Sequence, residues 1–314
     1  MRVLVTGVSG QLGHDVMLAL ARRGYEAIGT ARRLPEAPPT LGKRLGLETP
    51  PPSFVQMDLT DEARVRAEIK EIRPDAVVHC AAWTAVDAAE DEENREKVFA
   101  ANVLATRFVA EAAKGVDAKM LYLSTDYVFD GQGERPWQPD DKNYAPLNVY
   151  GQSKLDGELT VVGTLDKYFI VRISWAFGKN GKNFIKTMLN VGRTHDTVRV
   201  VNDQIGTPTY TADLARLLVD MIETEKYGYY HATNEGGFIS WYDFTCEIYR
   251  QAGLHTTVLP VSTEEYGLSK AKRPFNSRLD KSKLVEAGFT PLPDWKDALT
   301  RYLREIGELG NGTD

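Results

Sequence analysis

The chain has 314 residues and a formal net charge of −6 at pH 7, and 42% of its residues are hydrophobic. This composition is ordinary for a globular protein, and the acidic balance disfavours a general nucleic-acid binder. Two cysteines and no apolar run of membrane-spanning length favour a reduced, cytoplasmic protein without a membrane partner.

A predicted strand at the N-terminus leads into a glycine-rich turn. Residues 2–6 are apolar and β-branched, and a helical pattern runs from residue 11 to residue 23. Between them, Gly7, Gly10 and Gly13 allow a tight turn and a close approach of the backbone to a pyrophosphate. An ordinary strand–helix turn is the alternative, but the position between a strand and a helix favours a dinucleotide site.

The second predicted strand, residues 25–30, ends without a carboxylate. Sites that prefer NAD carry an acidic residue here, which holds the ribose hydroxyls. In this chain Arg32 and Arg33 follow, and two guanidiniums suit the 2′-phosphate of NADPH. The alternative is that both arginines are solvated at the start of a loop. Residues 34–52 are rich in proline, which predicts an irregular surface insertion.

Two further strands, 54–57 and 76–80, end in candidate cofactor contacts. Asp58 is placed to accept a hydrogen bond from an adenine amino group, or to cap the helix predicted over 62–72, although Thr60 or Asp61 suits the cap better. After residue 80, small residues would let a dinucleotide pass close to the backbone; this stretch is Ala81, Ala82, Trp83 and Thr84. Asn102 is a polar residue in the long helix predicted over about 94–114, and it would fix a neighbouring loop, bind water or serve the structure alone.

Three polar groups of the next unit are predicted to converge. Thr125 follows a strand over 120–124, and Tyr150 and Lys154 lie one turn apart in a helix over about 148–162. Together they suit proton transfer to a carbonyl oxygen, which Thr125 would orient. The Lys154 charge and an oxidised nicotinamide should lower the Tyr150 pKa from about 10. An exposed pair of no consequence is the alternative.

The remaining pattern completes the fold prediction. With a strand over 168–173, strands and helices alternate, which predicts an α/β, Rossmann-like, doubly wound parallel sheet over residues 1–175. Residues 176–314 carry less regular elements and predict a smaller, interleaved substrate-binding region, with returns to the sheet near 205–235. Its predicted helices lie at about 183–193, 212–223, 240–251 and 295–306, and its strands at 198–201 and 228–232.

Several of these motifs together resemble the extended short-chain dehydrogenase/reductase family. They are the glycine turn after Thr6, the pairs Asp58 with Leu59, Ala81 with Ala82 and Ser124 with Thr125, and the spacing of Tyr150 and Lys154. Within that family, longer stretches are similar to the dTDP-4-dehydrorhamnose reductases. These stretches lie at residues 81–90, 124–131, 146–151, 172–175, 203–209 and 273–280, so the resemblance covers nearly the whole chain.

The resemblance implies a reaction and a set of site residues. The reaction is reduction of the C4 ketone of a dTDP-linked 4-keto-6-deoxy sugar to dTDP-L-rhamnose, a surface-polysaccharide precursor, with NADPH or NADH. Thr125, Tyr150 and Lys154 take the catalytic places. Cofactor contacts fall at Gly10, Gln11, Leu12, Asp58, Leu59, Ala82, Trp83, Thr84, Tyr150 and Lys154. Sugar contacts fall at Thr84, Val86, Thr125, Asp126, Tyr127, Tyr150 and Trp175, with a rim or core position as the alternative for Trp175.

No metal is predicted. Some family members bridge two subunits through glutamates and a magnesium ion; Asp15 occupies one such place here, and the others have no clear match. The five histidines show no metal-ligand spacing. A monomer is therefore favoured, with a homodimer as the alternative.

Two other functions stay open. One is an epimerase or a dehydratase of the same family, because Asp126 directly follows Thr125 and a dehydratase needs a carboxylate there. The other is a non-catalytic nucleotide-binding regulatory subunit, which the intact Thr125, Tyr150 and Lys154 argue against.

Overall fold

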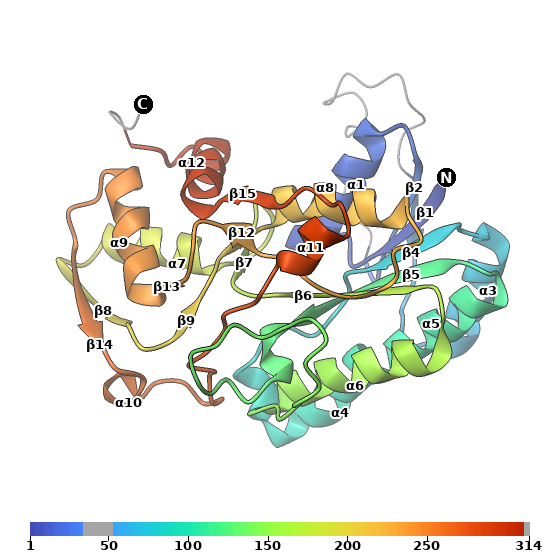
Figure 1. Ribbon diagram of the computed structural model, residues 1–314, viewed down its shortest axis with the longest axis horizontal. Coiled ribbons are helices and arrows are strands. Elements are labelled where there is room, and N and C mark those ends of the chain that lie inside the picture. The colour runs from blue at the N-terminus through green and yellow to red at the C-terminus, as the bar shows by residue number, and fades with distance from the viewer. Residues whose placement is uncertain (34–52, 311–314) are drawn as a thin grey trace.

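Seven parallel strands form the central sheet of the chain (Figure 1). The structure, a computed structural model, describes residues 1–33 and 53–310, so the proline-rich segment 34–52 lies outside the described residues. The sheet order is β11 (Gly228–His231), β6 (Tyr168–Ile173), β5 (Lys119–Thr125), β4 (Ala76–His79), β1 (Arg2–Thr6), β2 (Glu26–Ala31) and β3 (Ser53–Gln56). Every neighbouring pair in this sheet is parallel, which confirms the predicted doubly wound architecture.

The strand order reverses direction between β1 and β4. From β1 the chain builds outward through β2 to β3, then crosses back to β4 and builds the other way through β5 and β6. Ligands of open α/β sheets bind at the carboxyl ends of the strands beside such a reversal. Three predicted site features lie at this edge of the sheet: the glycine turn after β1, the loop at Ala81 after β4, and Thr125 at the end of β5.

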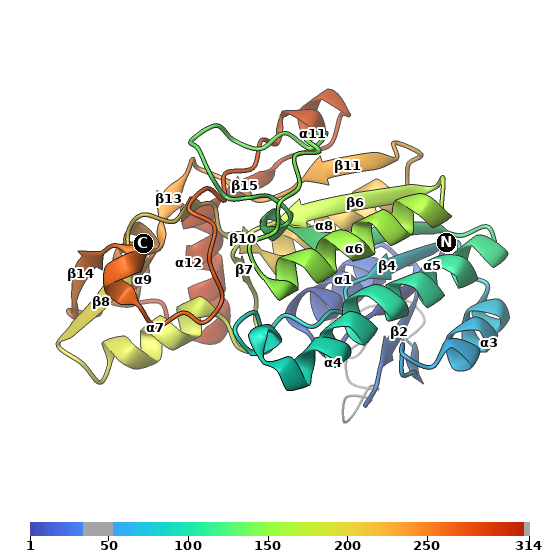
Figure 2. The ribbon, with the colours of Figure 1, turned by 90° about the horizontal axis from the view of Figure 1, so that it is seen from below.

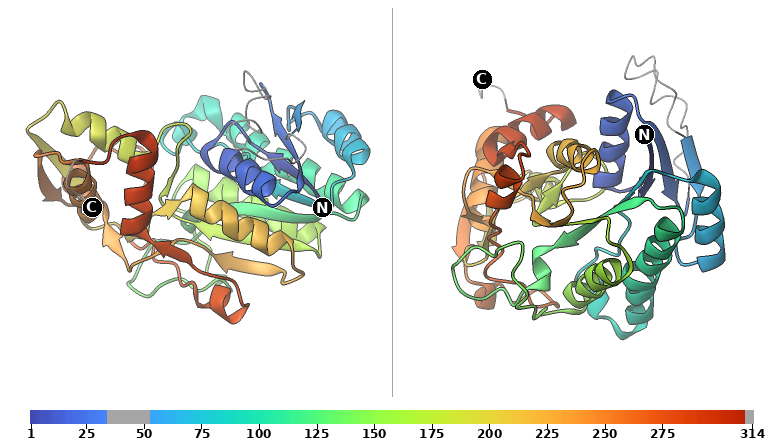
Figure 3. Two further views of the ribbon diagram at one scale, coloured as in Figure 1. Left: turned by 90° about the horizontal axis from the view of Figure 1, so that it is seen from above. Right: turned by 45° about the vertical axis from the view of Figure 1, so that its right-hand side comes forward.

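Helices cover both faces of the sheet. Figure 3 (left) shows α1 (Gln11–Arg22) beside α8 (Thr211–Ile222), and these helices share one apolar core with the sheet. Figure 2 looks onto the opposite face, where α5 (Ala105–Gly115) packs against α6 (Val149–Thr164), and α3 (Glu62–Ile72) completes the layer. The predicted boundaries of α1, α3, α6 and α8 agree with the structure to within two residues, and so does the end of α5.

The helix predicted over 94–114 is divided by a wider turn. It consists of α4 (Arg95–Phe99), a π-helical turn η3 (Ala100–Leu104) and α5. Such turns occur where a local interaction competes with the regular helix pattern. Here the buried Asn102 side chain lies in η3 and bonds to the loop after β4, as the site geometry shows.

The smaller region is a third apolar core with short strands around it. Helices α7 (Phe184–Gly192), α9 (Trp241–Ala252) and α12 (Trp295–Ile306) pack around Phe244 and Tyr302. Strand β8 (Thr197–Val201) pairs with β14 (Thr257–Val261) here and does not join the main sheet. The remaining elements are η1 (Ala88–Glu90), η2 (Glu92–Asn94), η4 (Asp126–Val128), β7 (Ala176–Phe177), β9 (Ile205–Gly206), β10 (Thr209–Tyr210), β12 (Asn234–Glu235), β13 (Ile239–Ser240), α10 (Thr263–Tyr266), α11 (Ser282–Glu286) and β15 (Leu292–Asp294).

Helix ends in this chain follow their predicted signals. Ser240 forms a capping box with Asp243 at the start of α9, a helix that the sequence predicts over about 240–251. Asp61 caps α3 by accepting from the Arg64 N–H at 3.0 Å.

Within the residues that the structure describes, no helix is both long and apolar enough to cross a membrane.

Candidate active site

Helix α6 begins at Val149 because two side chains accept its first free amide groups. Asn148 Oδ1 accepts from the Gly151 N–H at 2.7 Å, and Glu90 Oε1 accepts from the Val149 N–H at 2.8 Å. A Cβ atom on Gly151 would lie 2.4 Å from the Tyr127 carbonyl oxygen. Only glycine therefore lets the first turn of α6 lie this close to the loop after β5.

Thr125 is the last residue of β5, so this strand extends one residue beyond its predicted end at residue 124. Its hydroxyl donates to Asp126 Oδ1 at 3.0 Å and accepts from the Tyr127 N–H at 3.3 Å. The Tyr127 ring packs edge-on against the Tyr150 ring, with centroids 5.7 Å apart. The structure thus brings Thr125 and Tyr150 together, as the sequence predicted.

The pKa of Tyr150 departs from the expectation. Burial and the Asp126 carboxylate raise it well above the ordinary tyrosine value, while the Thr125 hydroxyl acts to lower it. A net lowering, predicted from the Lys154 charge and an oxidised nicotinamide, is therefore not found in the protein alone, because burial is the larger effect. The phenol is held in its protonated form, which is the form that can donate a proton.

Lys154 lies one helical turn after Tyr150 and is almost completely buried, with 3% of its surface exposed. Its ammonium nitrogen lies 4.0 Å from the centroid of the Tyr122 ring, a cation–π contact. Burial lowers the Lys154 pKa to about 7, although the charges of Glu158 and Cys80 act to raise it. This lysine therefore changes its charge near neutral pH.

A buried ion pair lies one further turn along α6. Arg172 Nε and Nη2 donate to the two carboxylate oxygens of Glu158 at 2.8 and 2.7 Å, and neither side chain is exposed to solvent. The Arg172 guanidinium also lies over the rings of Tyr229 and Phe129, at 4.7 and 4.9 Å. Sequence reasoning missed this pair, although Glu158 stands four residues after Lys154 on the same helix face.

Asp126 carries a buried carboxyl group at the edge of this cluster. Burial raises its pKa to about 6, and the hydroxyls of Ser277 and Thr125 act in the opposite direction. Its Oδ2 atom is buried and has no hydrogen-bond partner among the described residues. An unpaired buried oxygen of this kind is suited to a hydroxyl group of a ligand.

The glycine turn is packed as a dinucleotide site requires. Gly7 has a φ angle of +71°, and a Cβ atom there would lie 2.7 Å from the Ala81 backbone nitrogen. A Cβ atom on Gly13 would lie 2.4 Å from the Gly7 carbonyl oxygen. Gly10 precedes the first turn of α1, so the free amide groups of that turn lie at the edge of the sheet where the strand order reverses between β1 and β4.

Two residues after Gly10 have mainly structural contacts. Gln11 Oε1 accepts from Asn183 Nδ2 at 3.0 Å, which ties the start of α1 to the smaller region. Leu12 is half-buried against the core under α1. Their backbone remains at the helix start, where the resemblance places cofactor contacts.

The ends of β2 and β3 carry the predicted adenosine-side residues. Arg32 and Arg33 are exposed directly after β2, and Leu59 packs beside the core under α3. Asp58 Oδ1 accepts from the Thr60 backbone N–H and hydroxyl at 3.0 and 2.7 Å. These bonds, together with the Arg32 charge, lower the Asp58 pKa and leave its second oxygen as the candidate acceptor.

The loop after β4 is held from behind by Asn102. Trp83 N–H donates to Asn102 Oδ1 at 2.7 Å, and Asn102 Nδ2 donates to the Trp83 carbonyl at 3.2 Å and to Ser153 Oγ at 2.8 Å. Ser153 in turn donates to the Tyr150 carbonyl at 2.7 Å. Asn102 is completely buried, so it shapes the candidate cofactor wall and links it to α6 without facing into the site.

The rest of that wall is more open. The Ala81 N–H donates to Thr6 Oγ1 at 3.1 Å, which fixes the loop to the end of β1. Ala82 and Val86 are half-buried, and Thr84 is exposed.

Trp175 stands at the boundary with the smaller region. It has a φ angle of +50° and stacks on Trp241 with ring centroids 3.7 Å apart. A Cβ atom on Gly206 would lie 3.0 Å from the Trp175 ring. The positive φ is uncommon for a bulky residue and marks a position that the surrounding structure fixes. The partner Trp241 was not predicted from the sequence.

Asp15 is engaged inside the fold. It is 7% exposed, and its Oδ2 accepts from the Thr211 hydroxyl at 2.5 Å, while Oδ1 lies 3.2 Å from His14 Nδ1. This bond joins the starts of α1 and α8.

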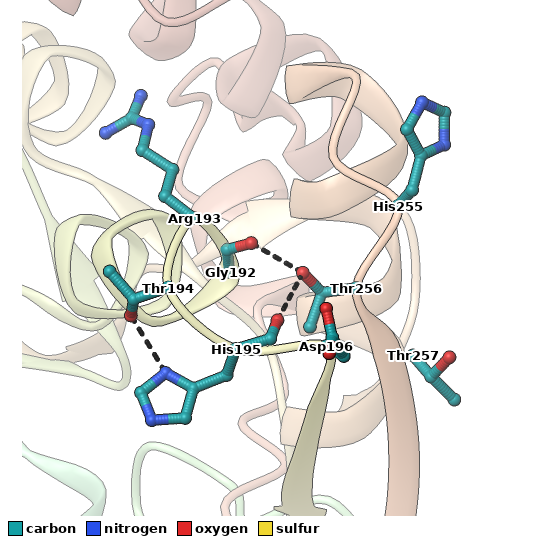
Figure 4. A pocket seen from close by; sticks show the side chains of 8 residues that line it. All are labelled: Gly192, Arg193, Thr194, His195, Asp196, His255, Thr256 and Thr257. Atoms are coloured by element: carbon teal, nitrogen blue, oxygen red, sulfur yellow. Dashed lines mark hydrogen bonds between the residues drawn. The ribbon is translucent and has the colours of Figure 1, made fainter.

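A surface depression on the smaller region offers a contrast (Figure 4). It lies between the end of α7 and the start of β14. The Thr256 hydroxyl bonds there to the carbonyls of Gly192 and His195 at 2.5 and 3.1 Å, and the His195 side chain is exposed. These bonds close a loop, and the acids and bases that line the depression are exposed or half-buried. The candidate active site is therefore the cluster around Tyr150.

The comparisons with known proteins agree with this site. Residues 1–307 match the model of the RmlD substrate binding domain family. The chain is 40% identical to dTDP-4-dehydrorhamnose reductase of Streptomyces griseus, over 95% of this chain and 92% of that protein. It is 37% identical to the spore coat polysaccharide biosynthesis protein SpsK of Bacillus subtilis, over 97% of each chain.

A solved structure gives the same result. The crystal structure of dTDP-4-dehydrorhamnose reductase from Bacillus anthracis in complex with NADP matches with a TM-score of 0.85 and 39% identity, over 97% of this chain and 99% of that one. The chain therefore belongs to the RmlD family, together with the dTDP-4-dehydrorhamnose reductases that it matches along nearly its whole length.

Proposed function

We propose that this chain reduces the C4 ketone of dTDP-4-dehydro-L-rhamnose to dTDP-L-rhamnose with NADPH. The observation that carries the proposal is the placement of Thr125, at the end of β5, against Tyr150, with Lys154 one turn further along α6, in a chain of the reductase family. The similarity to SpsK, named for spore coat polysaccharide biosynthesis, supports a role of the product in surface polysaccharide.

The residues present fit a dinucleotide. Gly7 and Gly13 leave no room for side chains at the turn, and the first turn of α1 offers amide groups for the phosphates. Arg32 and Arg33 are exposed at the end of β2, where a 2′-phosphate would lie, and this supports NADPH over NADH. The bound cofactor would supply the hydride that reaches the sugar C4.

The protein's own contribution is proton delivery and orientation. Thr125 would donate a hydrogen bond to the ketone oxygen and hold it toward Tyr150. Tyr150, protonated because its pKa is raised, would give its proton to the alkoxide that develops at that oxygen. Lys154 would lie near the nicotinamide ribose and stabilise the phenolate left on Tyr150 by its positive charge.

The substrate side would use the cluster beyond Tyr150. The unpaired Oδ2 of Asp126 and the Tyr127 ring are positioned for the sugar, and Trp175 for the sugar or the thymine. Two further expectations from the sequence stay predictions: a cytoplasmic location, and a monomeric chain with a homodimer as the alternative.

The test is a spectrophotometric assay with the dTDP-4-keto sugar generated in place. We expect NADPH absorbance to fall only when sugar and protein are both present, and more slowly with NADH. Absence of oxidation of either cofactor would contradict the reductase proposal, and turnover of the sugar without net cofactor consumption would indicate an epimerase or a dehydratase. In a variant with Arg32→Ala and Arg33→Ala, the preference for NADPH should decrease.

A further inference from the structure

The segment between α10 and α11 returns from the smaller region to the main sheet (Figure 1). On the way it is fixed at two neighbouring positions. Asn148 Nδ2, at the start of α6, donates to the Lys272 carbonyl at 2.8 Å, and the Ala271 N–H donates to Asp87 Oδ1 at 3.0 Å. The residue that follows, Arg273, is therefore held beside the loop after β4 and the start of α6.

Arg273 is only partly used by the protein. Its Nη2 donates to Asp87 Oδ2 at 2.6 Å, and its side chain is 18% exposed. Its Nη1 is buried and has no hydrogen-bond partner among the residues that the structure describes. Buried donors of a charged group are nearly always paired, because an unpaired one loses the hydrogen bonds of water without replacement. Nη1 is therefore available to an acceptor from outside the described part of the chain.

The position of Arg273 relates it to the reacting centre. Its charge acts on the Tyr127 hydroxyl and lowers the pKa of that group, against the effects of burial and of Asp126. Tyr127 packs edge-on against Tyr150. Arg273 therefore lies within electrostatic range of Tyr127, the residue whose ring contacts Tyr150.

The chemistry of the substrate proposed above indicates which ligand group Arg273 would bind. In a pyranose ring, the anomeric carbon lies across the ring from C4 and carries the nucleoside diphosphate. With C4 at Tyr150, the first phosphate would lie about one ring's width away, and Arg273 is the cation that acts on Tyr127, the neighbour of Tyr150. A phosphate oxygen is also the acceptor that a guanidinium binds best, through charge-assisted hydrogen bonds.

We propose that Nη1 of Arg273 binds the diphosphate of the nucleotide-sugar substrate, and that Asp87 is a positioning residue that orients the guanidinium. This inference rests on the proposed function and adds the contact that recognises the diphosphate. The Asp87 carboxylate accepts hydrogen bonds from Arg273 Nη2 and from the Ala271 amide. Nη1 of Arg273 is then left for the ligand.

The test compares ligands that differ only in phosphate. Isothermal titration of the NADP-saturated protein with thymidine, dTMP and dTDP measures the contribution of each phosphate. For Arg273→Gln we expect dTDP binding to weaken by about 10- to 100-fold and thymidine binding to change little. Arg273→Lys, which keeps the charge but loses the planar fork, should fall between the two.

Lys270→Gln is the matched control. Lys270 lies on the same segment and pairs with Asp91, but both partners are substantially exposed. Loss of this pair removes a fastening of the segment without touching the proposed ligand, so dTDP binding should change by less than about 3-fold. Equal weakening in Lys270→Gln and Arg273→Gln would overturn the proposal, because the effect would then belong to the segment's position.

Other outcomes also decide the matter. Unchanged dTDP binding in Arg273→Gln overturns the proposal, and so does an equal loss for thymidine and dTDP. Weaker binding of the keto sugar nucleotide with unchanged dTDP binding would assign Arg273 to the sugar and overturn the diphosphate contact. If Arg273→Gln unfolds in a melting experiment, the Arg273→Lys variant carries the same comparison.

The failure of this proposal is distinguishable from failure of the reductase function. NADPH oxidation by the unaltered protein tests the function alone. In Arg273→Gln, we expect a raised KM for the sugar nucleotide and a kcat close to the original value, because Arg273 does not touch the reacting atoms.

Discussion

The two halves of α6 hold buried charge in opposite ways. In the first half, the Lys154 ammonium lies over the face of Tyr122, and burial lowers its pKa to about 7. In the second half, Glu158 meets Arg172 through two hydrogen bonds, and both groups are completely buried. The first half therefore carries a lysine whose pKa lies near neutral pH. The second half carries a buried ion pair that links the helix to β6.

This difference follows from how each charge is compensated. Two charge-assisted hydrogen bonds from Arg172 compensate the Glu158 carboxylate inside the fold, so this pair serves as a structural link. A ring face compensates an ammonium only weakly. One helix therefore combines a rigid attachment to β6 with a reactive end, and the rigid pair holds Tyr150 and Lys154 in place against β5.

The largest effect is expected at the reactive end. Tyr150→Phe removes the proton donor and keeps the ring, so we expect kcat to fall by about 10²- to 10⁴-fold, the range for loss of a general acid. NADPH binding, measured by fluorescence titration, should persist. Tyr127→Phe is the matched control, because it removes the neighbouring hydroxyl while keeping the edge-on ring contact. A Tyr150→Phe rate near that of the unaltered protein would remove Tyr150 from this role.

The fixed end should respond in stability. Arg172→Met leaves the Glu158 carboxylate buried without its partner, and we expect a loss of about 3–5 kcal/mol in the free energy of unfolding. Changing both residues, with Glu158→Leu and Arg172→Met, should recover much of this loss, since no buried charge remains. Chemical denaturation measures all three proteins. An additive loss in the double variant would show that the pair is not the cause.

The contrast also explains what could be predicted from the sequence. Local patterns predicted the sheet strands and the caps, because hydrophobic period and cap residues act over a few positions. The spacing of Tyr150 and Lys154 is also local. The Glu158 pair with Arg172 and the stack of Trp175 on Trp241 depend on elements brought together by the fold, and residue types alone do not specify them. The same is true of the burial that raises the Tyr150 pKa.

Coupling between the two halves gives a pH prediction. Charged Lys154 supports the reaction and is lost as the pH rises through its pKa of about 7, so kcat/KM should fall above that pH. Glu158 raises the Lys154 pKa, and Glu158→Gln should therefore move the fall to lower pH. The measurement is kcat/KM against pH for both proteins. An unmoved midpoint in a folded Glu158→Gln variant would show that the two halves are electrostatically independent.

The smallest effect concerns the ring beneath Lys154. Tyr122→Leu removes the cation–π contact, worth roughly 0.5–2 kcal/mol, and should lower the Lys154 pKa and the pH midpoint by about 0.4 to 1.5 units. Tyr122→Phe keeps the ring and loses the hydroxyl, with its 3.3 Å bond to the Lys154 carbonyl, so its midpoint should stay in place. The pH profile of kcat/KM distinguishes them. Equal midpoints in the two variants would mean that the ring does not stabilise the ammonium, and that charged neighbours such as Glu158, in the second half of the helix, maintain the charge of Lys154.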